Sequence, residues 1–313
     1  MTQHRLRVYF TYTPIDSEIV NVVAPLFSKI NLEWIMGVKN LKTVRQDIAS
    51  SDLVVAIITP SSEDDMGVWR ECMIAETMTI PVVFLVQESV KSDPFAPWSR
   101  YKYKKFGDYQ QLASRLSLSL ITFAQKFASD PVYASSQLAE HSIIDQLKAS
   151  LDKNVLVLGR DSDGEGMEKI NTIKTVLERL HFNGLTLKEL PEIEFISLES
   201  KMARVAALCR FIIVEDSRAS GHIDELKICV TNEFITVIVR EAGTGSTWMQ
   251  SHYPMLYNYV RRFCYKGLNK AESDDLCDSI EPTLEKAVEN GIVWANDRIE
   301  YQARQFKTFY AHS

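Results

Sequence analysis

The sequence lacks the features that mark several large classes of protein. Its longest purely apolar run, Ile80–Val86, is far shorter than the roughly 20 residues of a membrane-spanning helix. The N-terminal residues show no apolar stretch followed by a cleavage site, so nothing there marks the chain for secretion. The five cysteines include no CxxC pair, which speaks against a zinc ribbon or a small disulfide scaffold. We therefore expect a cytoplasmic protein with no membrane contact.

A surplus of positive charge is also missing. The 35 Lys and Arg residues face 41 Asp and Glu residues, a net charge of −6, whereas binding to a phosphate backbone requires clustered basic residues. One run, Arg100–Phe106, interleaves basic and aromatic residues as single-strand binders do. In an acidic chain we expect this run to be a solvated loop whose rings cover a domain edge. Nucleic acid is not an expected partner.

Two glycine-containing loops resemble ligand-binding motifs, but each lacks a required residue. Gly243–Trp248 begins like a dinucleotide fingerprint and has tryptophan in place of the third glycine. The loop that starts at Asp161 resembles a calcium loop, but its twelfth residue is Thr172, where a bidentate glutamate is needed. No histidine pairs with another histidine or a cysteine at ligand spacing. We expect neither a metal nor a bound cofactor.

The first half of the 313 residues alternates strand-like and helix-like segments. Asp52–Thr59 is a nearly continuous apolar run, as expected of a strand that is buried on both faces. Strict alternation of this kind predicts a parallel sheet with helices on both faces. The expected strands are Arg7–Tyr12, Leu32–Met36, Asp52–Thr59 and Ile80–Gln87, and the expected helices are Ile19–Ile30, Leu41–Ser50, Val68–Met78 and Gln110–Ala128.

The second half repeats this order, and a glutamate follows the third strand in both halves, at Glu71 and Glu225. We therefore predict two tandem three-layer α/β domains with parallel, flavodoxin-like sheets, over residues 1–135 and 136–269. A helical tail over residues 270–313 follows. The expected strands are Asn154–Gly159, Leu185–Leu190, Phe211–Val214 and Ile235–Arg240, and the expected helices are Met167–Leu180, Leu198–Cys209 and His222–Val230.

Ligands of open parallel sheets bind beyond the carboxyl ends of the strands. In the first half these ends bring Thr11, Tyr12 and Ser61 to the rim at which the helix of Glu71 begins. A carboxylate there can hydrogen-bond ribose hydroxyls and stabilise an oxocarbenium-like centre as a glycosidic bond breaks. The alternative interpretation is structural, because the helix dipole alone favours glutamate near a helix start.

Three ordered segments of the first half also carry a family resemblance: Val8–Asp16, Ile48–Val55 and Val68–Ala75. They are similar to the opening strand, the third strand and the glutamate helix of the Toll/interleukin-1 receptor (TIR) domain family, over about residues 6–125. In catalytically active members the glutamate that matches Glu71 is essential for cleaving the nicotinamide–ribose bond of NAD. The resemblance therefore implies that Glu71 is catalytic and that Thr11, Tyr12, Ser61 and Trp69 contact the substrate.

The chain departs from the family pattern at Gly67, where tryptophan is usual four residues before the glutamate. The loop after the second strand, Gly37–Asn40, is also short. Many family members are scaffolds without enzymatic activity, so a non-catalytic signalling module stays open as an alternative.

The second half is similar to the broader group of TIR-like and nucleoside 2-deoxyribosyltransferase-like domains, through Glu215–Ser217 and Ser220–Glu225. The resemblance implies that Glu225 acts at a sugar, as in a deoxyribosyltransferase, although a ligand-sensing or dimerising domain is an equal alternative. The residues implied in binding a nucleotide-like ligand are Gly159, Arg160, Asp216, Ser217, Ser220 and Gly221.

The leading functional hypothesis is an NAD glycohydrolase or ADP-ribosyl cyclase, for which NAD is the substrate and not a cofactor. We expect ligand binding by the second domain to favour a homo-oligomer that completes the site of the first. Bacterial proteins that join TIR domains to a sensor often serve antiphage defence, which the resemblance extends to this chain as an expectation.

Overall fold

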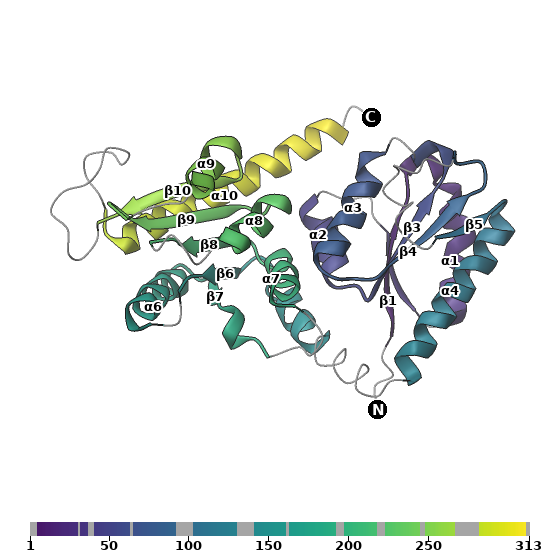
Figure 1. Cartoon of the computed structure of the whole chain (residues 1–313), viewed down its shortest axis with the longest axis horizontal. Helices are drawn as coiled ribbons and strands as arrows, with labels where there is room; N and C mark the ends of the chain where they lie inside the picture. The colour runs from purple at the N-terminus through teal and green to yellow at the C-terminus, as the bar shows by residue number, and fades with distance from the viewer. Residues whose placement is uncertain are drawn as a thin grey trace. The chain divides into compact units, whose positions relative to one another are not determined.

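The computed structural model describes residues 5–30, 32–36, 41–62, 65–91, 103–129, 141–160, 163–191, 197–217, 223–244, 248–266 and 282–310. The chain forms two compact units, Met1–Ile144 with Ile193–Ile196, and Asp145–Glu192 with Ser197–Ser313. Each unit holds its own five-stranded sheet (Figure 1). The predicted boundaries at residues 135 and 269 lie outside the described residues.

The sheet of the first unit has the strand order β2-β1-β3-β4-β5, and every neighbouring pair is parallel. This confirms the prediction of a parallel α/β fold. The central strand β3 is buried along its whole length, as its continuous apolar sequence predicts. The strands are β1 (Arg7–Thr11), β2 (Glu33–Met36), β3 (Leu53–Ile58), β4 (Val82–Gln87) and β5 (Tyr103–Phe106).

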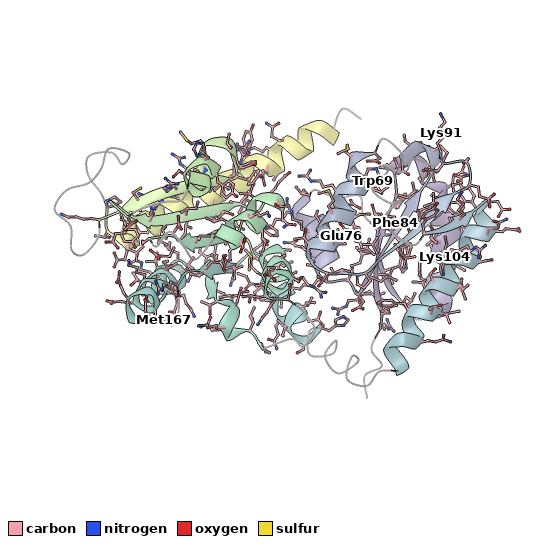
Figure 2. All side chains as sticks on the ribbon, viewed as in Figure 1. Trp69, Glu76, Phe84, Lys91, Lys104 and Met167 are labelled. Carbon is pink, nitrogen blue, oxygen red and sulfur yellow. The ribbon has the colours of Figure 1, made fainter. Side chains whose placement is uncertain are left out.

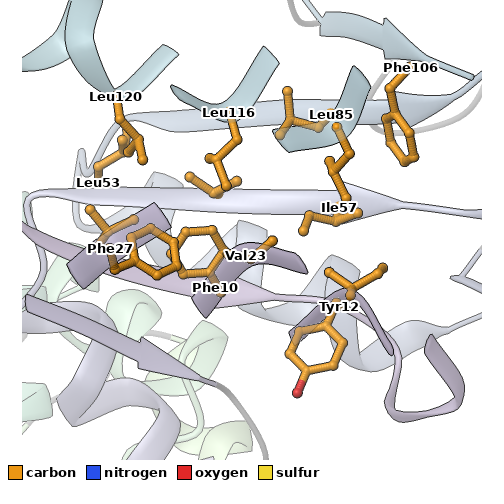
Figure 3. Close-up of a cluster of buried hydrophobic side chains, with 14 of the residues drawn as sticks. Phe10, Tyr12, Val23, Phe27, Leu53, Ile57, Leu85, Phe106, Leu116 and Leu120 are labelled. Carbon is orange, nitrogen blue, oxygen red and sulfur yellow. The ribbon is translucent and has the colours of Figure 1, made fainter. Parts of the chain in front are cut away.

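Helices cover both faces of this sheet. On one face α1 (Glu18–Ile30) and α4 (Tyr109–Ser129) enclose a large apolar cluster that includes Phe10, Phe27 and Leu116 (Figure 3). On the other face lies α3 (Met66–Thr77), which packs beside α2 (Leu41–Ala49) and contributes to a second cluster with β3 and β4. Short 3-10 helices follow β1 and β3, at Pro14–Asp16 and Pro60–Ser62.

The second unit repeats the topology of the first. Its strand order, β10-β9-β8-β6-β7, is the first unit's order read from the opposite edge, and all its neighbouring pairs are parallel. Its strands are β6 (Asn154–Leu158), β7 (Asn183–Leu185), β8 (Phe211–Glu215), β9 (Thr236–Glu241) and β10 (Val260–Tyr265). Its helices are α6 (Gly164–Arg179), α7 (Leu198–Ala207), α8 (Ile223–Thr231), α9 (Trp248–Leu256) and α10 (Leu284–Tyr310), and a short helix over residues 141–148 precedes them.

The expected helix near the C-terminus is confirmed, and it forms a layer of the second unit. Val288, Ile292 and Ala295 of α10 are buried in one cluster with α6 and the strands. In the first unit, the corresponding face of the sheet is covered by α1 and α4. Because α10 follows β10 as α4 follows β5, it holds the position in the second unit that α4 holds in the first.

Three local expectations were wrong or incomplete. The run that ends at Phe106 is not a solvated loop over its described part, because Tyr103–Phe106 forms edge strand β5 and Phe106 is fully buried. The strand expected at Leu185–Leu190 ends at Leu185, and a 3-10 helix with a Thr186–Glu189 capping box replaces the rest. Strand β10 was not predicted, because Arg261 and Arg262 interrupt its apolar pattern, as charged residues often do at sheet edges. Among the described helices, none combines the length and the hydropathy that a membrane span requires.

A buried polar contact within the first unit joins His141 to Asp52, the residue before β3. The carboxylate of Asp52 accepts a hydrogen bond from the backbone N–H of Arg7 at 2.7 Å, and its other oxygen lies 2.5 Å from Nε2 of His141. Both side chains are almost fully buried. Removing one partner of such a pair leaves the other buried without it, which is the costly case for buried polar groups.

We predict that His141→Ala lowers the free energy of unfolding by about 3 kcal/mol, since Asp52 then loses its imidazole partner. Urea unfolding followed by circular dichroism measures the effect. The control is His181→Asn, because His181 is exposed and asparagine tolerates its left-handed backbone conformation. Equal stability of the two variants would show that the buried pair does not stabilise the unit.

Candidate functional site

The candidate site lies where the strand order of the first sheet changes direction, between β1 and β3. Helix α3 starts close to the carboxyl end of β3, and Asp65 caps it by accepting the backbone N–H of Gly67 at 2.8 Å. A Cβ atom on residue 67 would lie 2.9 Å from Oδ1 of Asp65 and would disturb this cap. Glycine at position 67 leaves this cap undisturbed.

Glu71 is the half-buried acid of this helix. Its neighbours Val68, Cys72 and Ala75 are buried against the sheet, as their spacing predicts, and Glu71 lies at the margin of this stripe. Burial raises the pKa of Glu71 to about 7, and the negative charge of Asp65 acts in the same direction. A carboxyl group with this pKa populates both its protonated and its ionised form near neutral pH, which is typical of functional sites.

Tyr9 and Thr11 of β1 supply two hydroxyl groups on the same side as Glu71. Val8 and Phe10 belong to the apolar cluster under α1 and α4, so the alternation of a strand turns Tyr9 and Thr11 toward the face covered by α3. Both side chains have no exposed surface. Each hydroxyl acts as a donor that lowers the pKa of Glu71.

Within the described part of the chain, neither hydroxyl forms a hydrogen bond of regular geometry. Their contacts with Glu71 are therefore longer or less well aligned than regular hydrogen bonds, as is common for catalytic groups before a substrate binds. Burial also raises the pKa of Tyr9, so its hydroxyl stays protonated and remains a donor. Tyr9 was not among the predicted site residues, although it lies two residues before Thr11 and so shares its face.

The other predicted residues of the first unit lie in different surroundings. The ring of Tyr12 belongs to the cluster on the opposite face (Figure 3), although Glu71 contributes, after burial, to raising its pKa. Trp69 stacks on Phe84 with ring centroids 6.5 Å apart, inside the cluster between α3 and the sheet (Figure 2). Ser61 is exposed at the end of β3. The structure thus brings Thr11 and Tyr9 to Glu71, and places Trp69 in the core.

The second unit carries a glutamate in the matching helix without the matching hydroxyls. On α8 the residues one and four positions after Glu225 are buried, and the same holds for Glu71 on α3. In both units the next strand begins eleven residues after the glutamate. Strand register aligns Val8 with Val155, because each pairs with the first residue of the next strand, Leu53 or Phe211. The positions of Tyr9 and Thr11 are then taken by Leu156 and Leu158.

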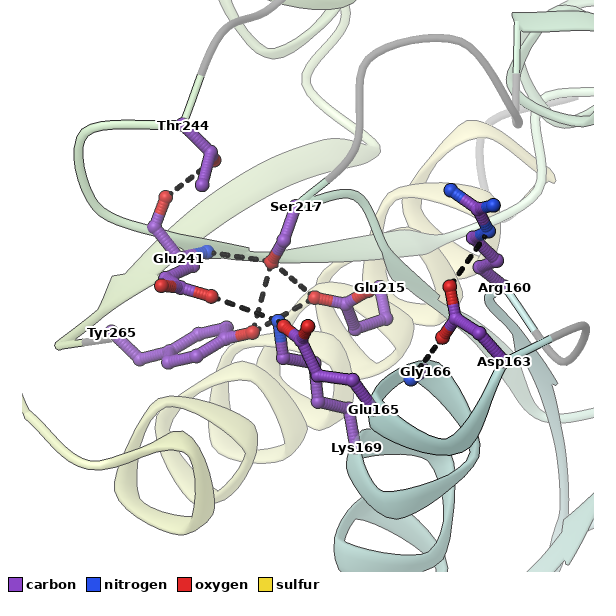
Figure 4. Close-up of polar contacts among 10 residues, drawn as sticks. All are labelled: Arg160, Asp163, Glu165, Gly166, Lys169, Glu215, Ser217, Glu241, Thr244 and Tyr265. Atoms are coloured by element: carbon purple, nitrogen blue, oxygen red, sulfur yellow. Dashed lines mark hydrogen bonds and ion pairs between the residues drawn. The ribbon is translucent and has the colours of Figure 1, made fainter. Parts of the chain in front are cut away.

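Polar side chains of the second unit gather on the opposite face of its sheet (Figure 4). The hydroxyl of Tyr265 donates to Oε1 of Glu215 at 2.8 Å, and Ser217 also donates to this oxygen. Ser217 further accepts the backbone N–H of Glu241 at 3.0 Å, so its hydroxyl is already used by the protein. Lys169 of α6 bridges Glu241, at 2.8 Å, and Glu165, at 2.9 Å. In the first unit, the positions that are equivalent to Glu215 and Tyr265 are occupied by the apolar residues Ile57 and Phe106.

The remaining predicted residues of the second unit surround the start of α6 and the end of β8. A Cβ on Gly159 would lie 3.1 Å from Ile170 and 3.3 Å from Glu215, so glycine permits a close approach there. Arg160 pairs through Nε with Asp163 at 3.0 Å, and Asp163 caps α6. Asp216 is fully buried, with Oδ2 lying 3.8 Å from Nη1 of Arg240. Ser220 and Gly221 lie outside the described residues. Among the described residues, no three His, Cys, Asp or Glu side chains are grouped to hold a metal ion.

No protein-family model matches the sequence, and no curated protein matches it. Solved structures give weak likenesses. A CMP N-glycosidase, BcmB, of Clostridium botulinum is 15% identical with a TM-score of 0.31, over 36% of this chain and 98% of that one. A xylose-binding transcription activator is 12% identical with a TM-score of 0.21, over 96% and 65%. A putative ketose/aldose isomerase of Clostridium novyi is 12% identical with a TM-score of 0.23, over 95% and 79%.

The raised pKa of Glu71 predicts a stability effect that needs no substrate. A carboxyl group whose pKa is higher in the folded state stabilises fully below its unfolded pKa of 4.5, and this contribution is lost as the pH rises through about 7. Glu71→Gln cannot ionise, so it should be more stable than the wild type by about 3 kcal/mol at pH 8.5 and nearly equal at pH 4.5. Urea unfolding at both pH values tests this. Glu76→Gln, at an exposed position of the same helix, is the control (Figure 2). A stability difference between Glu71→Gln and the wild type that does not change with pH would contradict the raised pKa of Glu71.

Proposed function

We propose that the first unit cleaves the nicotinamide–ribose bond of NAD, with Glu71 as the catalytic carboxylate. The observation that supports this most directly is the half-buried Glu71, at the switch point of the sheet, beside two buried hydroxyls that have no regular hydrogen-bond partner among the described residues. The resemblance to TIR domains supports the choice of NAD. The products would be nicotinamide and ADP-ribose, or a cyclised form of the latter.

The chemistry requires little beyond a positioned carboxylate. The bond between C1′ of the ribose and the pyridinium nitrogen breaks, and its electron pair neutralises the nicotinamide, which leaves without needing a proton. The positive charge that develops at C1′ and the ring oxygen is stabilised by an adjacent carboxylate. Water then adds to C1′ and releases one proton, for which ionised Glu71 is an available acceptor.

The proposal makes Glu71 active in its ionised form. Because burial holds the pKa of Glu71 at about 7, kcat/KM should rise with pH through this value and level off above it. Glu71→Gln should lower kcat/KM by roughly 100-fold or more, since the amide cannot stabilise the developing charge. Release of nicotinamide, measured by chromatography, reports both effects.

Glu76→Gln, on the exposed side of α3, should retain wild-type turnover in the same assay. Absence of turnover in the wild type at high protein concentration would overturn the proposal and favour a non-catalytic scaffold. Loss of turnover in Glu225→Gln, but not in Glu71→Gln, would move the chemistry to the second unit and favour a deoxyribosyltransferase-like enzyme. The leucines at 156 and 158 favour the first unit.

In this proposal the second unit binds a nucleotide-like ligand and regulates the first. Arg160 supports this, because it lies just beyond β6 at the switch point of its own sheet, with its side chain 45% exposed. A guanidinium group can pair with phosphate in fork geometry. The other residues of the proposed binding region are Gly159, Asp216, Ser217, Ser220 and Gly221. Of these, Asp216 and Ser217 are buried and would line the region from beneath. Antiphage defence is the biological role that the resemblance suggests.

The regulatory part predicts that a nucleotide increases both NAD cleavage and the sedimentation coefficient of the wild type, and that Arg160→Ala abolishes both responses. The physical requirement is a ligand that binds the assembled state more tightly, and a tenfold preference supplies about 1.4 kcal/mol. Arg179→Ala is the control, because Arg179 lies exposed at the C-terminal end of α6, opposite to the end near Arg160, and its loss removes only a surface ion pair with Glu289. Full activity of the dilute, ligand-free monomer would exclude this regulation.

A further inference from the structure

We propose that Tyr9 is a positioning residue, whose buried hydroxyl, assisted by that of Thr11, holds the carboxylate of Glu71 for the reaction. This inference rests on the proposed function and deepens it. It starts from the location of both side chains on the α3 face of β1, with no exposed surface.

The fold itself does not account for these two hydroxyls. A buried hydroxyl without a regular hydrogen bond costs roughly 1–3 kcal/mol, so most buried polar groups in folded proteins have partners. Within the described residues, the hydroxyls of Tyr9 and Thr11 lack such partners. Both lie on the side of the sheet that faces Glu71, and both lower the pKa of its carboxyl group. An arrangement that costs stability and converges on one acid indicates a functional requirement.

The second unit provides a comparison within the same chain. Its β6 has the register of β1 and the same neighbours on either side, and Leu156 and Leu158 occupy the positions of Tyr9 and Thr11. Both leucines are buried. The topology therefore accepts purely apolar residues at these positions, and the hydroxyls of the first unit are not a requirement of the fold.

The charges around Glu71 explain why donors are needed. Burial raises the pKa of Glu71 most, and the charge of Asp65, at the start of α3, raises it further. Burial also raises the pKa of Tyr9 most, followed by the charges of Glu71 and of Asp47 on α2. The pKa values of Tyr12 and Cys72 are likewise raised, by burial first and by the charge of Glu71 second. Burial and the carboxylate of Asp65 thus oppose the ionised form of Glu71, whereas the two hydroxyls favour it.

The test removes each hydroxyl while its side-chain shape is largely kept. In Tyr9→Phe, the midpoint of the Glu71 titration should rise by about one pH unit, because the variant lacks a hydroxyl dipole that favours the ionised carboxylate. The midpoint is obtained without substrate, from the pH dependence of the stability difference between each protein and its Glu71→Gln counterpart. The kcat/KM profile for NAD should shift by the same amount. Tyr109→Phe, at an exposed position of α4, should leave both unchanged.

The two readouts separate this inference from the proposed function. If the wild type does not cleave NAD, the proposed function fails, while the titration midpoint still tests the role of Tyr9. An unchanged midpoint in Tyr9→Phe would overturn the inference whether or not NAD is cleaved. If Tyr9→Phe does not fold, Thr11→Val replaces it, with a smaller upward shift expected and an unchanged midpoint counting against the inference.

Discussion

The pairing of β1 with both β2 and β3 is the constraint on which the candidate site depends. Because the chain leaves β1 for one neighbour and later returns on its other side, the connecting helices lie on opposite faces of the sheet. The carboxyl ends of β1 and β3 therefore meet at a point that neither connection covers. Helix α3 starts at this end of the sheet, and its sixth residue, Glu71, reaches the side chains of β1.

The two units have the same sheet topology but carry their polar side chains on opposite faces of the sheet. In the first, the α3 face of β1 carries hydroxyls at Tyr9 and Thr11, while the other face is closed by Ile57 and Phe106. In the second, leucines replace the hydroxyls, and Glu215 and Tyr265 replace the apolar pair. The polar network of the second unit has its hydrogen bonds made within the protein, as a structural network requires. Equivalent positions in the two units therefore hold two different arrangements. In the first unit, two hydroxyls without regular hydrogen bonds lie on the side of Glu71, and in the second the polar side chains are hydrogen-bonded to one another.

Much of the fold was predictable because the central strands are long and apolar and alternate with amphipathic helices. Strand β3 and helix α1 show this, since their bounds differ from expectation by only a residue or so. Edge strand β10 was not predictable in this way, since Arg261 and Arg262 hide its pattern. Its place is set by pairing with β9 and by contacts with α9 and α10, which its own sequence does not show. Of the site, Glu71 and Thr11 were predictable from strand ends and from the family resemblance. Tyr9 was not identified, because a tyrosine within an apolar strand reads as a core residue until its partner across the layer is known.

Nearness in the sequence was a poor guide to which residues share the candidate site. Thr11 and Tyr12 are adjacent, yet the pleat of the strand sends them to opposite faces, and Tyr12 joins the apolar cluster there. Trp69 is two residues from Glu71, yet the helical rotation turns its ring onto Phe84. Residues separated by sixty positions, Thr11 and Glu71, converge instead, because parallel pairing sets the ends of distant strands beside one helix. The surroundings that set the pKa of this acid are consequently supplied by a strand that the sequence places far from it.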